Sequence, residues 1–369
     1  MGKNKKIRIK REDADTKSDT DTCSPPTSAS HPDTRSLADT VLEDYRIIYG
    51  RQYHAGWWNS DYPLPNDTTA NNFLDLMHCS IEALVGQKPP RFLWTSALAS
   101  SRRMRAIDIG CGTGIWAIEF AKKHPTWEVI GTDISPTQHP ERPANLTFRM
   151  EDFKRPHGWS FRNNSVDFVH MQCLKESVSD WHELLKEACR VLKPGGWLQN
   201  VEYSSKVFSK NLRFGENCPN IYVMGLFTDE ISKRSGCPLS VVEDDYIRPI
   251  LNEVGFRVED EITTACALSP SGLQGRYRDA ALFAQAAFRM DIKGYLQRLL
   301  IEQLGWTFLM VSNLVERMHN ELTTECSGPF DAYIHVQSIL SQKRPPRGRK
   351  RPASSPLTNP RERRRDPSR

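Results

Sequence analysis

The sequence predicts an α/β fold with a largely parallel sheet. Short apolar runs alternate with segments of helical spacing across residues 105–205, with turns between them. Alternating strands and helices favour a parallel sheet with right-handed crossovers and helices on both faces. The runs interpreted as strands are residues 106–109, 128–133, 146–150, 165–171 and 197–203.

The first strand ends in an acid and a turn with three alternating glycines, in the order Asp108, Gly110, Gly112 and Gly114. Glycine lets the backbone turn sharply and approach a ligand closely, and helical spacing follows over 115–122. The dinucleotide pattern G-x-G-x-x-G is not met from Gly110 or from Gly112. Asp108 is suited to hold an ammonium group by a charge-assisted hydrogen bond. The stretch therefore predicts a site for S-adenosylmethionine, a nucleotide-like cofactor with a cationic amino-acid end.

The second strand ends in Asp133, followed by Ile134. An acid at the end of the next strand is what ribose recognition needs in a doubly wound sheet, because both strand ends border one crevice. We therefore expect Asp133 to accept hydrogen bonds from the ribose hydroxyls and Ile134 to belong to the same cofactor site.

The third strand ends in Glu151, Asp152 and Phe153. We expect Asp152 to accept from the adenine amino group, with the adjacent Glu151 as the alternative. An aromatic side chain offers a flat apolar face, so Phe153 or Met150 is expected to face the adenine ring.

The fourth strand carries a titratable residue at each end. Asp167, at its start, is interpreted as satisfying neighbouring backbone groups. His170, at its far end, lies where the transferred methyl group is expected and is the one candidate for catalysis; a packed or solvated histidine is the alternative. A helix predicted over 180–191 stops at a turn over 193–196, before the fifth strand.

Four stretches of this region, DIGCGTGIWAIEFA, VIGTDIS, SVDFVH and RVLKPGGW, resemble the motifs of class I methyltransferases. Residues 49–54, 64–67 and 74–78 narrow the resemblance to the LaeA-like fungal methyltransferases, which include regulators of secondary metabolism and tailoring enzymes. The resemblance covers about residues 40–342. It implies a Rossmann-like, mostly parallel sheet of seven strands with helices on both faces, an N-terminal helical lid and a helical insertion before the last strand. It also implies S-adenosylmethionine as the cofactor.

The chain is expected to divide into five regions. Two ends, residues 1–37 and 343–369, lack core-forming content and are expected to be disordered. A helical cap over 38–96 precedes the cofactor-binding core over 97–205. Residues 206–342 complete the domain and include the insertion, which is expected to cover the acceptor site.

Within the cap, Asp67 or Thr68 can begin a helix with an apolar stripe at Phe73, Met77, Ile81 and Leu84. Taken alone, this pattern is typical of a packing helix. The alternative is a lid over the methionine end of the cofactor. In that case the residues expected to line the crevice are Tyr49, Arg51, Tyr53 and His54.

Beyond the core, the spacing predicts a helix over 244–254 and strands over 256–268 and 333–340. Between those strands, helical spacing recurs over 280–290, 295–300 and 308–322. We expect these helices to present an inward apolar face, including Phe283 and Phe288, to the acceptor.

Charge is concentrated at the ends of the chain. Residues 1–11 hold six Lys or Arg and no acid, and residues 12–44 hold nine acids. Residues 343–369 hold eleven basic residues and two acids, a net charge of +9 that leaves −4 on residues 1–342 of a chain whose total is +5. The core is therefore not expected to bind nucleic acid directly. The basic tail resembles a nuclear-import signal, so the nucleus is the expected location and the cytoplasm the alternative.

Neither a membrane span nor a structural metal is expected. No apolar run approaches the roughly 18 residues of a membrane span. The nine cysteines include no C-x-x-C pair, so free thiols are expected.

Two function classes remain open. One is a nuclear regulator acting with transcriptional-regulator partners and on a protein acceptor. The other is a cytoplasmic tailoring enzyme that methylates a secondary-metabolite small molecule.

Overall fold

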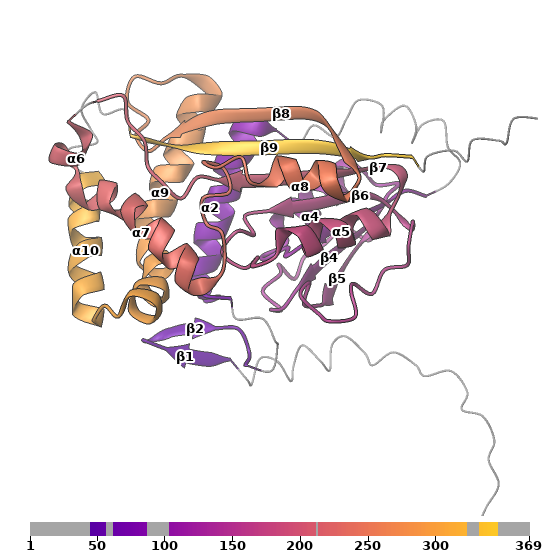
Figure 1. Ribbon diagram of the computed structural model, residues 1–369, viewed down its shortest axis with the longest axis horizontal. Coiled ribbons are helices and arrows are strands. Elements are labelled where there is room, and N and C mark those ends of the chain that lie inside the picture. The colour runs from indigo at the N-terminus through magenta and orange to yellow at the C-terminus, as the bar shows by residue number, and fades with distance from the viewer. Residues whose placement is uncertain (1–44, 57–61, 87–102, 212, 323–331, 346–369) are drawn as a thin grey trace, which may run out of the picture.

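The computed structural model describes residues 45–56, 62–86, 103–211, 213–322 and 332–345. Its centre is a seven-stranded sheet in the order β5-β4-β3-β6-β7-β9-β8 (Figure 1). The strands are β3 (Arg105–Ile109), β4 (Glu128–Asp133), β5 (Leu146–Met150), β6 (Val166–Gln172), β7 (Leu192–Tyr203), β8 (Phe256–Ala267) and β9 (Tyr333–Lys343). Strands β3 to β7 pair in parallel, whereas β9 is antiparallel to both β7 and β8. The predicted Rossmann-like, mostly parallel sheet of seven strands is confirmed.

The remaining elements are a short hairpin and helices before, between and after the strands. They are β1 (Arg46–Ile48), β2 (Arg51–Tyr53), α2 (Thr68–Val85), α4 (Ile115–Lys123), α5 (Trp181–Val191), α6 (Phe214–Asn217), α7 (Pro219–Ser235), α8 (Ile247–Val254), α9 (Gly275–Arg298), the π-helix η1 (Leu299–Gln303) and α10 (Phe308–Asn320).

Helices cover both faces of the sheet, as predicted. On one face Ala106 and Phe168 pack against Trp116 of α4. On the other face Ile107 and Val169 pack with residues of α5 and α8. Because successive side chains of a strand point to opposite faces of the sheet, one apolar strand contributes to the hydrophobic core on both faces.

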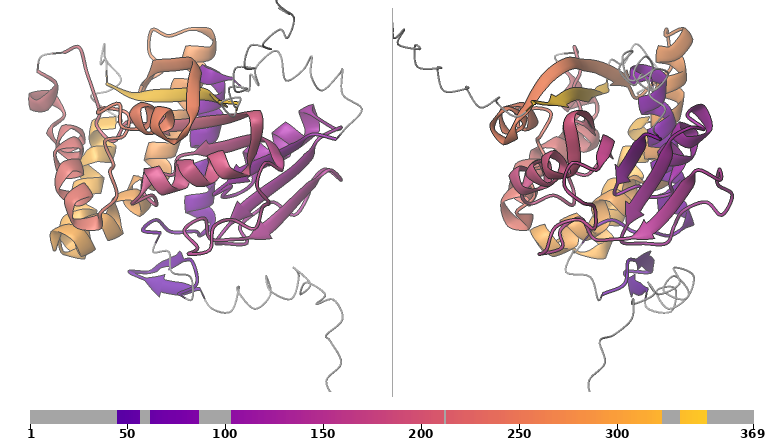
Figure 2. Two further views of the ribbon diagram at one scale, coloured as in Figure 1. Left: turned by 45° about the vertical axis from the view of Figure 1, so that its right-hand side comes forward. Right: turned by 90° about the vertical axis from the view of Figure 1, so that its right-hand side faces the viewer.

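Helices α7, α9 and α10 gather at one end of the molecule, away from the β4 and β5 edge (Figures 1 and 2). Helices α9 and α10 lie between β8 and β9 in the chain, which confirms an insertion before the last strand. The backbone of Asp291 leaves helical geometry (φ −147°, ψ 36°), so α9 consists of two segments. This break falls between the first two of the three helical stretches that the spacing predicts, 280–290 and 295–300.

Two boundaries differ from the prediction. The expected turn over 193–196 lies inside β7, which begins at Leu192 directly after α5. The pairing with β6 is irregular between Val166 and Phe168, and Gly195 has a φ of +77°. The Pro-Gly-Gly stretch is therefore accommodated as an irregularity of the strand. Helix α8 begins at residue 247, because Asp245 has a φ of +49°.

The hairpin and α7 were not predicted. Each hairpin strand has three residues, too few for a detectable period. The buried face of α7 includes Gly225 and Thr228, which interrupt its apolar stripe.

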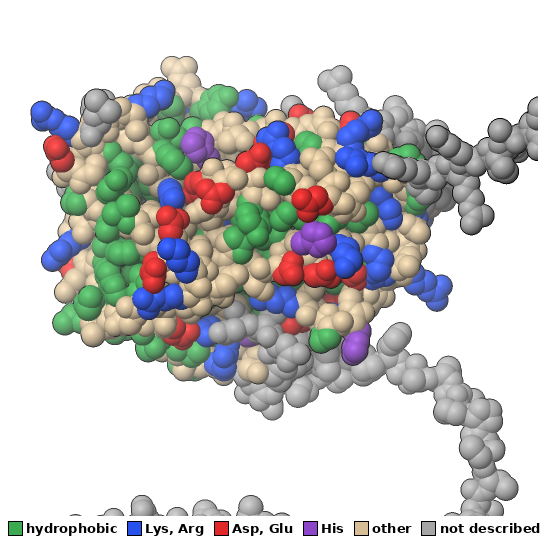
Figure 3. All heavy atoms as spheres, in the orientation of Figure 1, with side chains coloured by type: hydrophobic (Ala, Val, Ile, Leu, Met, Phe, Trp, Pro, Cys, Tyr) green, Lys and Arg blue, Asp and Glu red, His purple; other side chains and the backbone are tan. Residues whose placement is uncertain are grey.

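The described surface carries charges of both signs. On the face shown in Figure 3, acidic and basic side chains are interspersed, and no continuous basic stripe crosses it. Among the helices that the structure describes, none has the length and apolar character of a bilayer span.

Candidate cofactor and acceptor site

The Gly-rich loop after β3 is built around backbone conformations that only glycine adopts easily. Gly110, Gly112 and Gly114 have φ values of +64°, +55° and +80°. A Cβ on Gly110 would lie 2.6 Å from Leu174 Cδ2, and a Cβ on Gly114 would lie 2.4 Å from Phe148 Cζ. The backbone conformation of this loop therefore requires glycine at all three positions, even without a ligand.

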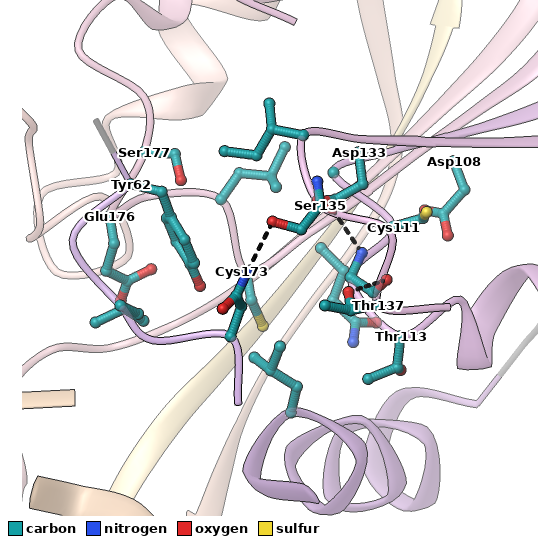
Figure 4. Close-up of a pocket in the computed structure, with 18 of the residues that line it drawn as sticks. Tyr62, Asp108, Cys111, Thr113, Asp133, Ser135, Thr137, Cys173, Glu176 and Ser177 are labelled. Atoms are coloured by element: carbon teal, nitrogen blue, oxygen red, sulfur yellow. Dashed lines mark hydrogen bonds between the residues drawn. The ribbon is translucent and has the colours of Figure 1, made fainter. Parts of the chain in front are cut away.

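The ends of β3, β4, β5 and β6 open into one cavity, which we call the central pocket (Figure 4). It spans about 1250 Å³, including its mouth. Eight of the nine predicted cofactor residues line it: Asp108, Gly110, Gly112, Asp133, Ile134, Glu151, Asp152 and Phe153. Gly114 is not among the lining residues, because the Phe148 ring lies over it. Its position is explained by packing rather than by ligand contact.

The surroundings of Asp108 show whether the pocket fits a cationic cofactor. Its side chain is buried, and within the described part of the chain nothing hydrogen-bonds to its carboxylate. Burial and the nearby Asp133 hold the pKa of Asp108 well above its ordinary range. A buried carboxylate without a donor is unfavourable, and an ammonium group would supply both charge and donors. The pocket therefore fits the amino-acid end of S-adenosylmethionine.

Asp133 is already engaged with the backbone. Its Oδ2 accepts from the N–H of Gly112 at 2.8 Å, and its Oδ1 accepts from the N–H of Ser135 at 2.9 Å. Burial raises the pKa of Asp133 to about 6, although the hydrogen bonds from these backbone donors act to lower it. Each carboxylate oxygen can accept more than one hydrogen bond, so ribose recognition by Asp133 stays a prediction.

The two acids after β5 differ in their partners. Both Glu151 oxygens accept from Ser160, one from its N–H at 2.7 Å and one from its hydroxyl at 2.5 Å. Asp152 Oδ1 accepts from the N–H of Lys154 at 2.8 Å. Both acids are thus engaged with their own loop, and Asp152 as the adenine partner, with Glu151 as the alternative, stays a prediction. Phe153 lines the pocket, whereas Met150 does not.

His170 lines the pocket but is poorly suited to accept a proton. Its ring stacks on Trp116 with centroids 3.8 Å apart. Burial lowers the pKa of His170 to about 3, and His78 contributes to the same shift. A neutral imidazole of such low basicity is a weak general base near neutral pH. A role in packing fits this environment, and catalysis by His170 stays a prediction.

Asp167 lies at the opposite end of β6 from the pocket. Its Oδ2 accepts from the N–H of Arg105 at 2.9 Å and from Lys193 Nζ at 2.7 Å. The interpretation that it satisfies a neighbouring backbone group is confirmed.

The cap contributes to the pocket with other residues than those predicted. Tyr49, Arg51, Tyr53 and His54 are not among the lining residues. Arg51 instead pairs with Asp67 at 2.6 Å and with Asp291 at 2.7 Å.

The lining comes from α2 and the segment before it, including Tyr62, Asn66, Phe73, Leu74, Met77 and His78. Asn66 donates to the Ser135 hydroxyl at 3.1 Å, and Thr113 donates to Asp75 at 2.5 Å. These bonds tie the cap to the loops around the cofactor site, so α2 is both a packing helix and a wall of the pocket. Asp67 caps it by accepting from the N–H of Ala70.

The insertion does not line the central pocket. Phe288 is buried in the core beside it, whereas Phe283 is 37% exposed. Neither phenylalanine lines the central pocket, because α9 directs its buried face at α2 and β8, and the expectation that both face the acceptor stays a prediction. Its contribution is indirect: Tyr295 donates to Glu176, which does line the pocket.

Sequence reasoning missed Glu176 and Tyr62. A signal for Glu176 was present, since Lys175 and Glu176 form a charged pair just beyond the end of a buried strand, where ligands bind in this fold. Among the described residues, no cluster of three His, Cys, Asp or Glu is arranged to hold a metal ion.

Comparisons with known proteins agree with this geometry. Residues 84–260 match the family model Methyltransf_23, described as a methyltransferase domain. Methyltransferase pytC of Aspergillus terreus is 28% identical over 278 residues, covering 74% of this chain and 80% of pytC. The secondary metabolism regulator laeA of Aspergillus niger is 28% identical over 316 residues, covering 81% of this chain and 76% of that protein.

A shorter match is closer in sequence. The protein-methionine methyltransferase laeA of Emericella nidulans is 36% identical over 154 residues, covering 42% of this chain and 39% of that protein. With the fold, the Gly-rich loop and these relatives together, the chain is a methyltransferase whose cofactor is S-adenosylmethionine, and its sequence is similar to the LaeA-like proteins.

Proposed function

We propose that this methyltransferase acts in secondary metabolism as a nuclear regulator, together with transcriptional-regulator partners. The enzymatic part rests on Asp108, which is buried beside the Gly-rich loop and accepts no hydrogen bond at its carboxylate from the residues that the structure describes. Similarity to laeA of Aspergillus niger supports the regulatory part. The basic segments at both ends of a negatively charged body support the nuclear location, although residues 1–44 and 346–369 lie outside the described residues.

The described residues assign a task to each part of the pocket. Asp108 would hold the ammonium group of S-adenosylmethionine, Asp133 the ribose hydroxyls and Asp152 the adenine amino group. The cofactor supplies an activated methyl group when bound. The protein then has to align the acceptor with that methyl group and exclude water from both.

The cap performs the exclusion. Tyr62, Asn66 and the apolar face of α2 lie across the pocket from the strand ends, and the bond from Asn66 to Ser135 closes one side. No base is compulsory when the acceptor is already nucleophilic, which agrees with the low pKa of His170.

The proposal is tested in cells that lack the protein. They are complemented with the wild type, with Asp108→Asn, or with Asp229→Asn as a control at a side chain that is 65% exposed. Transcripts and untargeted metabolites are compared. The wild type and the control are expected to restore transcripts of several biosynthetic genes, and Asp108→Asn is expected to fail although it is folded.

A tailoring methyltransferase is the second candidate, favoured by the similarity to pytC and by the enclosed pocket. It predicts a different result in the same experiment: one metabolite would lose one methyl group while transcripts stay unchanged. For the regulator, the name of the Emericella nidulans relative makes protein methionine an acceptor to examine by mass spectrometry.

A further inference from the structure

The central pocket extends past the cofactor residues to the ends of β6 and β7, where Tyr62, Glu176, Ser177 and Tyr203 line it. Figure 4 shows Glu176, Ser177 and Tyr62 on the opposite side of the pocket from Asp108 and Asp133. The residues assigned to the ammonium and ribose groups, Asp108 and Asp133, belong to the other side. This end is therefore available to the methyl acceptor.

Glu176 presents one carboxylate oxygen at this end. Its Oε1 accepts from the hydroxyls of Tyr295 at 2.9 Å and Tyr203 at 3.3 Å, and Lys175 Nζ lies 2.8 Å from the same oxygen. Glu176 is 3% exposed, and no described residue donates to its Oε2. The two hydroxyl donors and the adjacent ammonium group of Lys175 hold the carboxylate in a fixed orientation. Its second oxygen is left for a ligand.

The charge of the pocket selects the sign of that ligand. Its lining holds five carboxylates and a single Lys or Arg, Lys154: the acids are Asp108, Asp133, Glu151, Asp152 and Glu176. Lys175 is not a lining residue; it is fully buried, with its Nζ 3.2 Å from the centroid of the Tyr203 ring. At the acceptor end, the carboxylate oxygen Oε2 of Glu176 disfavours an anionic acceptor. A carboxylate beside an aromatic ring, here that of Tyr62, is a combination that binds cationic nitrogen.

We propose that Glu176 determines the specificity of the acceptor subsite, and that this subsite takes an acceptor that carries a protonated amine. The amine donates to Glu176 Oε2 and lies beside the ring of Tyr62. This inference rests on the methyltransferase function and adds the chemical class of its acceptor. The amine can belong to a small molecule or to a lysine side chain of a protein.

The test uses three probes that share one ring and differ at one end. They are tyramine, tyrosol and 4-hydroxyphenylacetate, which carry an ammonium, a hydroxyl and a carboxylate. Binding to the full chain, saturated with S-adenosylhomocysteine, is measured by calorimetry. Tyramine is expected to bind at least tenfold more tightly than tyrosol, and the carboxylate not at all up to 10 mM. Nα-acetyl-lysine methylamide is a second arm; tighter binding of this probe than of tyramine would indicate a protein as the source of the amine.

Two variants locate the effect. Glu176→Gln is expected to abolish the preference for tyramine while the affinity for S-adenosylhomocysteine changes less than twofold. Glu202→Gln is the matched control, since Glu202 is buried nearby, does not line the pocket, and has its pKa raised to about 8 by burial. It is expected to keep the preference. Melting temperatures verify that both variants are folded.

The outcomes distinguish a failure of the proposed amine subsite from a failure of the methyltransferase function. If S-adenosylhomocysteine binds and tyramine shows no advantage in the wild type, the amine subsite is overturned while the methyltransferase function stands. A preference that survives in folded Glu176→Gln overturns the role of Glu176. Failure of the wild type to bind S-adenosylhomocysteine contradicts the methyltransferase function itself. The comparison of probes on the wild type needs no variant and decides whether the subsite prefers an amine. If Glu176→Gln does not fold, Glu176→Asp takes its place, and an unchanged preference in that shorter side chain overturns the role of Glu176.

Discussion

The backbone N–H of Gly112 donates a 2.8 Å hydrogen bond to Oδ2 of Asp133 and so joins the Gly-rich loop after β3 to the end of β4. Parallel neighbours β3 and β4 bring these residues together although they are 21 positions apart in the chain. The same carboxylate also holds the N–H of Ser135. Asp133 thus fixes the backbone of two segments next to the predicted ribose site, the Gly-rich loop after β3 and the segment after β4.

Asp133→Ala is expected to weaken binding of S-adenosylmethionine and of its demethylated product. Loss of hydrogen bonds to a charged acceptor amounts to about 1.5–3 kcal/mol, or roughly ten- to a hundredfold in affinity. Calorimetry on the purified chain measures the change, and Asp229→Ala serves as the exposed control. Equal affinities of the wild type and Asp133→Ala would remove Asp133 from the site.

Cofactor affinity is also expected to depend on pH through Asp133. Its pKa of about 6 lies above the ordinary value, so the carboxylate gains a proton as the pH falls through 6. If the ionised form accepts from the ribose, the contribution of Asp133 to affinity is complete well above pH 6 and is lost as the pH falls through about 6. Calorimetry from pH 5 to 8 tests this, and Asp133→Asn should flatten the profile. An unchanged slope in that variant would assign the titration to another group.

Gly114→Ala is expected to destabilise the fold through Phe148 rather than through lost cofactor contacts. Gly236→Ala is a matched control, since its φ of +74° is similar but its Cβ would meet nothing within 4 Å. The control should cost about 1–2 kcal/mol from backbone strain alone. Gly114→Ala should cost roughly 1–3 kcal/mol more, because of overpacking against Phe148.

Thermal melting compares the two glycine variants. Adding Phe148→Leu to Gly114→Ala should restore part of the difference by making room for the new methyl group. If both glycine variants melt alike, Phe148 does not explain the requirement for Gly114.

Two phenylalanines of α9 are expected to respond differently, and neither through the acceptor. Phe288→Ala should cost about 3–5 kcal/mol because the ring is buried, whereas Phe283→Ala should cost far less at 37% exposure. Since neither lines the central pocket, methyl transfer per folded molecule should be unchanged in both. Thermal melting with cofactor and a labelled-methyl assay measure the two quantities. Reduced transfer in folded Phe283→Ala would place the acceptor nearer to α9.

A deletion that tests nuclear import should begin at residue 346 rather than at 343. Lys343 is the last residue of β9, where its Nζ donates to Leu192 O, and Arg344 N donates to Gly255 O. A fluorescent fusion without residues 346–369 is expected to lose nuclear enrichment and keep cofactor affinity, because the deletion removes basic residues that follow β9 in the sequence and leaves every described strand intact. Deletion of residues 1–11 is combined with it. Nuclear signal that persists without both basic ends would favour the cytoplasmic tailoring enzyme.

The sequence alone determined the order of the sheet strands along the chain and the residues that we predict to hold the cofactor. These follow from local rules: apolar periodicity reports burial, and an acid next to alternating glycines at a strand end reports a ligand. Asp108, Asp133 and Asp152 could be predicted as site residues because they lie at or near the carboxyl ends of parallel strands. These ends meet along one edge of the sheet, independently of how the side chains pack.

The tertiary structure decided which residues complete the pocket. Gly114 proved to pack under Phe148, and Arg51 pairs with Asp67 and Asp291 instead of facing the cofactor. Glu176 acquires its orientation from Tyr203 and Tyr295, the second of which is 119 residues away. Such contacts depend on how the insertion and the cap dock on the sheet. Long-range packing of this kind leaves no period or spacing in the chain, so no local pattern of residues reports it.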